Sequence, residues 1–97
     1  MLFLEPPMNE QRILEELVML LEANGVVIRR EPLAGRAGGL FTVNGRHLFF
    51  LDTQASSVEV ASVAAEAVAK LIDIESIYLR PEIRQFIESH GSSVKER

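Results

Sequence analysis

The stretch LFTVNGRHLFFL, residues 40–51, decides the fold of this chain. Two runs rich in aromatic and aliphatic side chains flank the dipeptide Asn44-Gly45. Asparagine followed by glycine is the preferred pair for a type I′ turn, because both central residues of that turn have positive φ. The stretch therefore predicts an antiparallel β-hairpin closed by a two-residue turn.

The two-residue turn also predicts which side chains share a face of the hairpin. Val43 is expected opposite Arg46, and successive side chains along a strand point to alternate faces. One face then carries Phe41, Val43, Leu48 and Phe50, and the other carries Leu40, Thr42, His47, Phe49 and Leu51. Both sets are largely apolar, so we expect cover on both faces, from helices on each side or from a partner chain on one.

A first helix is predicted over residues 10–24, upstream of the hairpin. Asn9 is a good N-cap, and Met8 is expected to pack on Ile13 as a hydrophobic staple. Apolar residues recur at three- and four-residue spacing along this segment. Gly25 then supplies the left-handed residue that ends many helices.

Two further helices are predicted downstream of the hairpin. Ser56 and Glu59 have the spacing of a capping box and open an alanine- and valine-rich helix that is expected to reach Leu71. Pro81 suits the first turn of a short last helix, which is expected to end at Gly91.

The remaining segments are predicted as strands and loops. Residues 26–28 are β-branched and predict a strand that the charged residues 29–31 and Pro32 end. The glycine-rich residues 33–39 are expected to form a loop, and residues 74–79 are a possible fourth strand.

These elements together predict an α+β fold. The chain of 97 residues has room for one domain, in the order α-β-β-β-α-(β)-α, with an antiparallel, hairpin-centred sheet packed with helices. We expect an N-terminal extension at residues 1–8, the domain at residues 9–91 and a flexible tail at residues 92–97.

Charge and cysteine content disfavour several classes of function. A net charge of −4 does not suit nonspecific binding to nucleic acid or anionic membranes. The absence of cysteine removes disulfides, thiolate catalysis and thiolate metal sites, so a reducing cytoplasm is the expected location. The apolar residues 1–4 run directly into Glu5-Pro6-Pro7, too soon for a signal peptide or a membrane span.

A small anionic ligand is one candidate for binding. Glycines free backbone amides, and guanidinium groups suit phosphate or carboxylate, so such a site is expected around the loop at residues 33–39. Its candidate residues are Arg29, Arg30, Gly35, Arg36, Gly38, Gly39 and Arg46. The competing interpretation is a plain connection whose arginines keep one end of the sheet soluble.

Catalytic, metal and cofactor sites are not predicted. His47 and His90 share no metal-binding spacing, although Asp52 could complete a site if the fold joined them. His47 is more simply a cross-strand partner of Thr42. The serines are better explained as helix caps or as part of the C-terminal tail than as nucleophiles. The aromatic residues alternate with aliphatic ones, which indicates a hydrophobic core rather than a surface on which nucleic-acid bases stack.

Residues 28–71 resemble a family of small bacterial proteins that has no assigned activity. The similarity lies in the Arg-Glu-Pro-Leu, Gly-Gly-Leu and Phe-Leu-Asp patterns. A more distant resemblance is to the front part of ImmA/IrrE-type metallopeptidases, in which a hairpin leads into the helix that bears His-Glu-x-x-His. In that resemblance the two positions of the zinc-binding histidines are Ala65 and Ala69, and alanine cannot bind a metal. Without zinc, Glu66 has no metal-bound water to activate.

We therefore expect a non-enzymatic cytoplasmic protein that acts through protein contacts, as a homo-oligomer such as a homodimer or with another protein. The apolar excess on both faces of the hairpin motivates this hypothesis. The alternatives are a binding module for a nucleotide or phosphorylated metabolite, and a zinc-less relative of the metallopeptidases.

Overall fold

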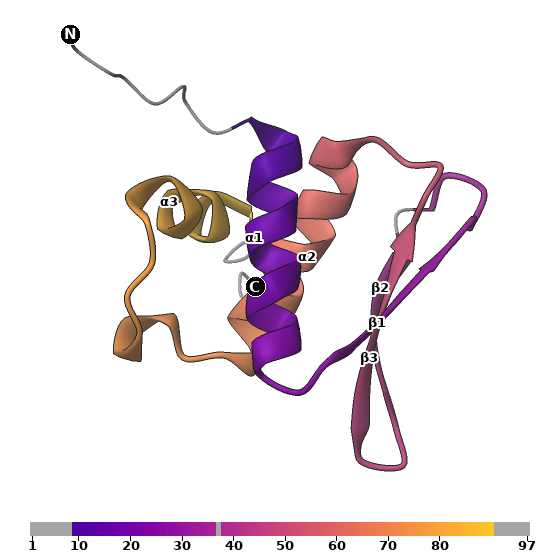
Figure 1. Ribbon diagram of the computed structural model, residues 1–97, viewed down its shortest axis with the longest axis horizontal. Helices are drawn as coiled ribbons and strands as arrows, with labels where there is room; N and C mark the ends of the chain where they lie inside the picture. Colours follow the sequence, from indigo (N-terminus) through magenta and orange to yellow (C-terminus); the bar gives the residue numbers. More distant parts are fainter. Residues whose placement is uncertain (1–8, 37, 91–97) are drawn as a thin grey trace, which may run out of the picture.

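Three helices and three strands follow one another in a computed structural model that describes residues 9–36 and 38–90 (Figure 1). The elements are α1 (Glu10–Ala23), β1 (Val27–Glu31), β2 (Gly38–Val43), β3 (Arg46–Asp52), α2 (Ser57–Leu71), the short 3-10 helix η1 (Ile74–Ser76) and α3 (Pro81–His90). The predicted α+β single domain is confirmed. The predictions for Met8, Gly91 and the tail fall outside the described residues.

The hairpin has the predicted register. Val43 pairs with Arg46 and Phe41 with Leu48, in antiparallel strands. Asn44 and Gly45 have φ values of 53° and 78°, the two positive angles that a type I′ turn requires.

The sheet is mixed and has the strand order β1-β3-β2. β1 lies parallel to β3, with Val27 opposite Leu48 and Arg29 opposite Phe50. β3 is therefore the central strand, and its side chains have neighbours on both sides. β1 and β2 form the two edges.

β1 is longer than predicted. It continues through Arg29 and Arg30 to Glu31, so the prediction that charged residues end the strand was wrong. The charges are compatible with β1 because it is an edge strand whose side chains reach water on both faces. The strand ends where Pro32, which lacks an N–H donor, follows it.

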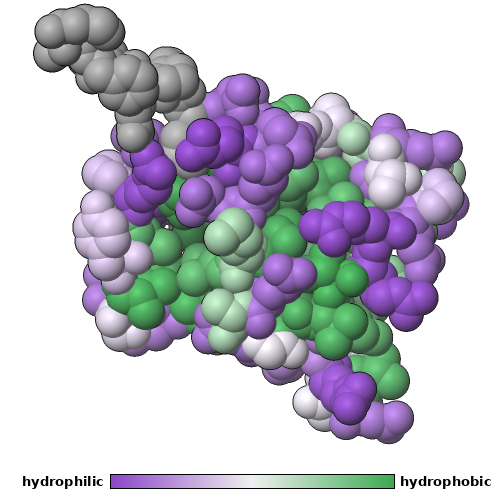
Figure 2. Space-filling model, in the orientation of Figure 1, coloured by the Kyte–Doolittle hydropathy of each residue, from purple (hydrophilic) through white to green (hydrophobic). Residues whose placement is uncertain are grey.

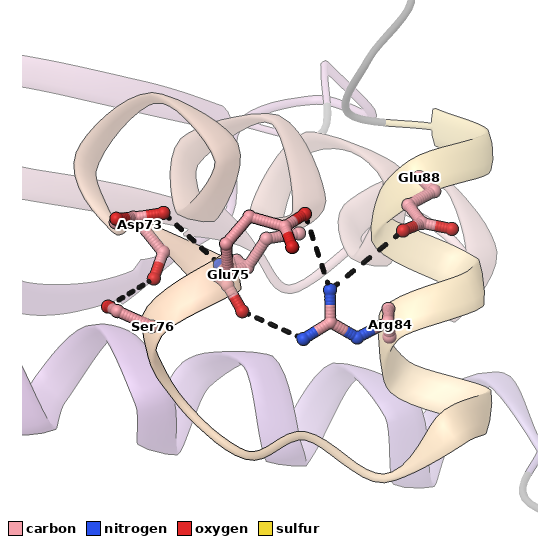
Figure 3. A network of polar contacts seen from close by, with 6 residues as sticks. Asp73, Glu75, Ser76, Arg84 and Glu88 are labelled. Carbon is pink, nitrogen blue, oxygen red and sulfur yellow. Dashed lines mark hydrogen bonds and ion pairs between the residues drawn. The ribbon is translucent and has the colours of Figure 1, made fainter.

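Residues 74–79 contain no strand, and the prediction of a fourth one was wrong. Asp73 caps the 3-10 helix η1 by accepting a 3.1 Å hydrogen bond from the backbone N–H of Glu75 (Figure 3). Arg84 of α3 donates a 2.8 Å hydrogen bond to the carbonyl oxygen of Ile74 and lies 3.6 Å from the carboxylate of Glu75. These polar contacts hold the segment as a turn against α3.

The helix ends follow their predicted caps. The side chain of Asn9 accepts from the N–H of Arg12, and Ser56 and Glu59 form both hydrogen bonds of the capping box. Gly25 has a φ of 85°, and the N–H of Val26 donates to the carbonyl oxygen of Leu21. The first helix ends at Ala23, one residue before the predicted end.

All three helices lie on one side of the sheet, which Figure 1 shows nearly edge-on. The inner face of the sheet is buried against them, with Phe49 completely enclosed and Leu51 nearly so. The core is completed by apolar residues of α1, by the small residues of α2, and by Ile83 and Ile87 of α3. In the described part of the chain, no element covers the opposite, outer face of the sheet.

Candidate functional site

The outer face of the sheet carries a contiguous apolar patch. We call it the outer apolar face and define it as Val27, Phe41, Val43, Leu48 and Phe50. Phe41, Leu48 and Val27 form a row across all three strands, because Leu48 pairs with Phe41 on one side and with Val27 on the other. Phe50 and Val43 extend the patch in opposite directions along the strands.

These side chains are more exposed than is usual for residues of their size. Phe41 is 54% exposed, Val43 49% and Val27 43%, whereas Leu48 and Phe50 are half-buried by their neighbours. The Phe41 and Phe50 rings meet edge to face with centroids 5.5 Å apart, so each ring restricts the other. The face therefore presents an ordered aromatic pair to solvent.

Charged residues border the outer apolar face at both ends. Arg29, beside Phe50, donates a 2.9 Å hydrogen bond to the carboxylate of Glu31 on the same strand. Arg46 lies at the opposite end, next to the hairpin turn. A polar rim around an apolar centre is the usual layout of a protein interface.

Gly39 and Gly38 differ in how much room surrounds them. Gly39 lies beside Phe50 on the outer face, and a Cβ there would meet only the Phe41 ring, at 3.9 Å. Gly38 has a φ of 95°, and a Cβ there would overlap the backbone of Phe50. Of these two residues, only residue 38 has to be glycine. The missing side chain at Gly39 leaves a shallow open place on the outer face.

The candidate residues for anion binding do not converge. Arg46 pairs with Val43, which lies five residues along β2 from Gly38, a distance of about 17 Å in an extended strand. Arg29 points to the outer face with Phe50, whereas Arg30 points to the inner face with Leu51. Arg46 therefore lies at the far end of the sheet from the loop, so the expectation that it lies near the loop is not met. Arg29 and Arg30 lie at the loop end, level with Gly39 and Gly38 across β3.

The loop at residues 33–36 already uses several of its amides. The N–H of Leu33 donates to the Asp52 carboxylate at 2.9 Å, the N–H of Ala34 donates to the Gln54 side chain, and the N–H of Arg36 donates to the carbonyl oxygen of Leu33. Gly35 lies in this turn with a φ of 79°, and Arg36 is exposed. These three donors are unavailable to an anion in this conformation.

Asp52 is a buried residue whose structural role was not predicted from the sequence. Its side chain is 1% exposed, and one carboxylate oxygen accepts from the N–H groups of both Leu33 and Gln54. It thereby joins the loop after β1 to the turn after β3. The sequence signal for this role was the position of Asp52 directly after the apolar residues 48–51 of β3.

A hollow of about 540 Å³ lies between α1, the ends of β1 and β3, and the start of α2. Its floor contains Leu14, Val18 and Val60, and its rim contains Arg30 and Glu15. Figure 2 shows apolar surface between α1 and the sheet in this region, interrupted by hydrophilic side chains. The hollow is open and carries charges of both signs, so its residues favour no single ligand chemistry.

Metal ligands are not gathered into a cluster in residues 9–36 and 38–90. No three His, Asp or Glu side chains of this part lie together as metal ligands. His47 contacts Thr42 at 3.0 Å across the hairpin, as predicted, and His90 stacks on Phe86. Ala65, at one of the positions that the metallopeptidase resemblance compares with zinc ligands, is completely buried in the core.

Comparison of the chain with protein-family models, with curated proteins and with solved structures finds no match. Within the described residues, no helix combines the length and the apolar character that a membrane crossing needs.

Proposed function

We propose that this chain is a non-enzymatic protein-interaction module of the cytoplasm and that the outer apolar face is its contact surface. One observation supports this function above all. Phe41 is about half exposed at one end of an apolar row that crosses all three strands, on the side of the sheet that no described element covers. An apolar sheet face is normally buried against a second layer, and among residues 9–36 and 38–90 that layer covers the inner face alone.

The composition of the face suits binding to a protein. Aromatic side chains supply the main contacts at many interfaces, because they bury a large area and lose few rotatable bonds. Phe41 and Phe50 already restrict each other before any partner arrives, so binding orders fewer side chains. Arg29, Glu31 and Arg46 supply a charged rim that selects the orientation of the partner.

The two alternatives have less support. A small anionic ligand would have to bind at residues 33–39, where three backbone amides are already used and Arg46 is distant. A relative of the metallopeptidases would lack zinc, because Ala65 offers no ligand and fills a packed core position. Neither alternative explains why the outer apolar face is exposed.

Site-specific photocrosslinking in cells tests this function. A photoreactive phenylalanine analogue is introduced at Phe41 in one variant and at Val58 in another. Val58 is a matched control, because it is an apolar residue of α2 that is 43% exposed. We expect a discrete adduct from residue 41, identified by mass spectrometry as this chain or as one defined protein, and none from residue 58. Equal labelling from both positions would contradict the proposed function.

A further inference from the structure

We infer that the partner of the outer apolar face is an acidic amphipathic helix supplied by another protein. This inference rests on the proposed function and names the class of its partner. The helix packs its apolar side chains on the row formed by Phe41, Leu48 and Val27. Its acidic side chains lie toward the arginines at the two ends of the face.

The pairing of β1 with β3 favours a helix as the covering layer. These two strands are parallel, and parallel strands are typical of sheets whose two faces are both covered by helices. Residues 48–51 of β3 are apolar without interruption, which is the pattern of a strand that is buried on both sides. Among the described elements, α1 and α2 pack on the inner face alone (Figure 1). One further helix would complete the second layer.

Charge is segregated along this chain, and the sheet belongs to its basic part. Residues 26–51 hold four arginines and one glutamate, which gives a net charge of +3. The rest of the chain holds six basic and thirteen acidic residues, which gives a net charge of −7. A basic surface on an otherwise acidic protein attracts an acidic partner and repels a basic one.

Arginines stand at both ends of the outer apolar face. Arg46, beside the turn, is exposed and forms no ion pair with another residue of the described ranges 9–36 and 38–90. Arg29, beside Phe50, contacts Glu31, yet its side chain is still 54% exposed. Two copies of this face would bring these arginines against one another, whereas an acidic helix offers each of them a carboxylate.

The size of the face fits a single helix. Three strands about 4.8 Å apart and five paired residues of about 3.3 Å each give a face of roughly 14 by 17 Å. A helix is about 10 Å wide, and about eleven residues, or about three turns, span the longer side. Stable interfaces between whole proteins bury about 800 Å² on each partner, which is far more than this face offers. A short helix needs no larger surface than the one present.

Gly39 gives the helix a place to insert one side chain. A Cβ at this residue would meet only the Phe41 ring, at 3.9 Å, so the space above it is open. Gly39 is also in register with Phe50, whose ring contacts that of Phe41. A large apolar side chain seated over Gly39 therefore contacts two aromatic rings, which is the surrounding that interface anchor residues prefer.

Selection from a library of displayed random peptides tests this inference. The full chain is immobilised, and peptides of about 16 residues are enriched, long enough for about three helical turns with their caps. We expect the enriched peptides to carry apolar residues at positions i, i+3, i+4 and i+7, and an excess of Asp and Glu elsewhere. Phe41→Ala and Arg46→Glu should each weaken their binding about tenfold. Arg12→Glu is the matched control, because Arg12 is an exposed arginine of α1, and it should leave binding within about twofold.

The pattern of the enriched peptides decides whether a helix binds this face. Helical spacing with acidic residues, together with weakening by the two face variants alone, supports the inference. Apolar residues that alternate, an excess of basic residues, equal binding to Phe41→Ala, or no enrichment at all would overturn it. A photocrosslinked adduct that contains only this chain would also overturn it, whereas the proposed function would then stand.

Discussion

The backbone at Gly38 passes so close to the carbonyl oxygen of Phe50 that a side chain at residue 38 has no space. Gly38 also has a φ of 95°, which side chains rarely permit. We expect Gly38→Ala to lower the free energy of unfolding by about 3 kcal/mol or more, from overlap and backbone strain together. Urea denaturation measures this loss.

Gly39→Ala is the matched control for that substitution. Its Cβ would make only an ordinary contact with the Phe41 ring, so we expect a change within about 0.5 kcal/mol of zero. Equal losses for the two variants would show that the close approach of β2 to β3 at Gly38 is not as described.

Phe41 and Phe49 are the same residue type on opposite faces of one hairpin. Phe49 is completely buried, so Phe49→Ala should cost about 3–5 kcal/mol. Phe41→Ala removes a half-exposed ring and its contact with Phe50, so we expect a loss of only about 1 kcal/mol. Thermal and urea unfolding measure the loss of stability in each variant. A larger loss for Phe41→Ala would show that Phe41, and not Phe49, lies on the core side of the sheet.

Asp52 and Asp73 each accept a hydrogen bond from the N–H two residues along the chain. Only Asp52 is buried, and it also accepts from Leu33. Asp52→Ala leaves two partly buried backbone hydrogen bonds without their acceptor and should cost about 2–4 kcal/mol. Asp73→Ala should cost about 1 kcal/mol, because water can replace the lost cap. Amide hydrogen exchange should show faster exchange at Leu33 in Asp52→Ala alone, and unchanged exchange there would contradict the role of Asp52.

Histidines at residues 65 and 69 would complete the His-Glu-x-x-His pattern of the metallopeptidases. Ala65 is completely buried, so Ala65→His overfills the core and should destabilise the fold by about 2 kcal/mol or more. We expect the double variant Ala65→His/Ala69→His to gain no thermal stability from zinc. A zinc-dependent rise in its melting temperature would revive the metallopeptidase resemblance.

Local chemistry made much of this fold predictable from the sequence. The Asn44-Gly45 turn specifies its own register, and the pair Ser56 and Glu59 specifies the start of α2, because each signal depends only on neighbouring residues. The segment at residues 74–79 was mispredicted because Asp73 can cap a turn and because its apolar residues resemble a strand. The contact with Arg84, ten residues away from Ile74, was not readable from the local pattern.

The candidate site depended on long-range pairing, which local signals do not specify. The hairpin predicted two apolar faces, but nothing in residues 40–51 states on which side the helices pack. Because β1 continues through both residues, Arg29 and Arg30 point to opposite faces of the sheet. The turn itself separates Arg46 from the glycine loop by the length of β2. A cluster of basic residues in the sequence therefore did not become a cluster in space.

An NMR titration tests most directly the central claim that the outer apolar face is a contact surface of this chain. Backbone amide spectra are recorded while the tightest-binding peptide from the library selection is added, until the spectra no longer change. We expect peptide-dependent shifts at Phe41, Leu48 and Val27, and constant shifts along α1 and α3. Spectra that do not change with added peptide, or shifts confined to the helices, would contradict binding at the outer apolar face.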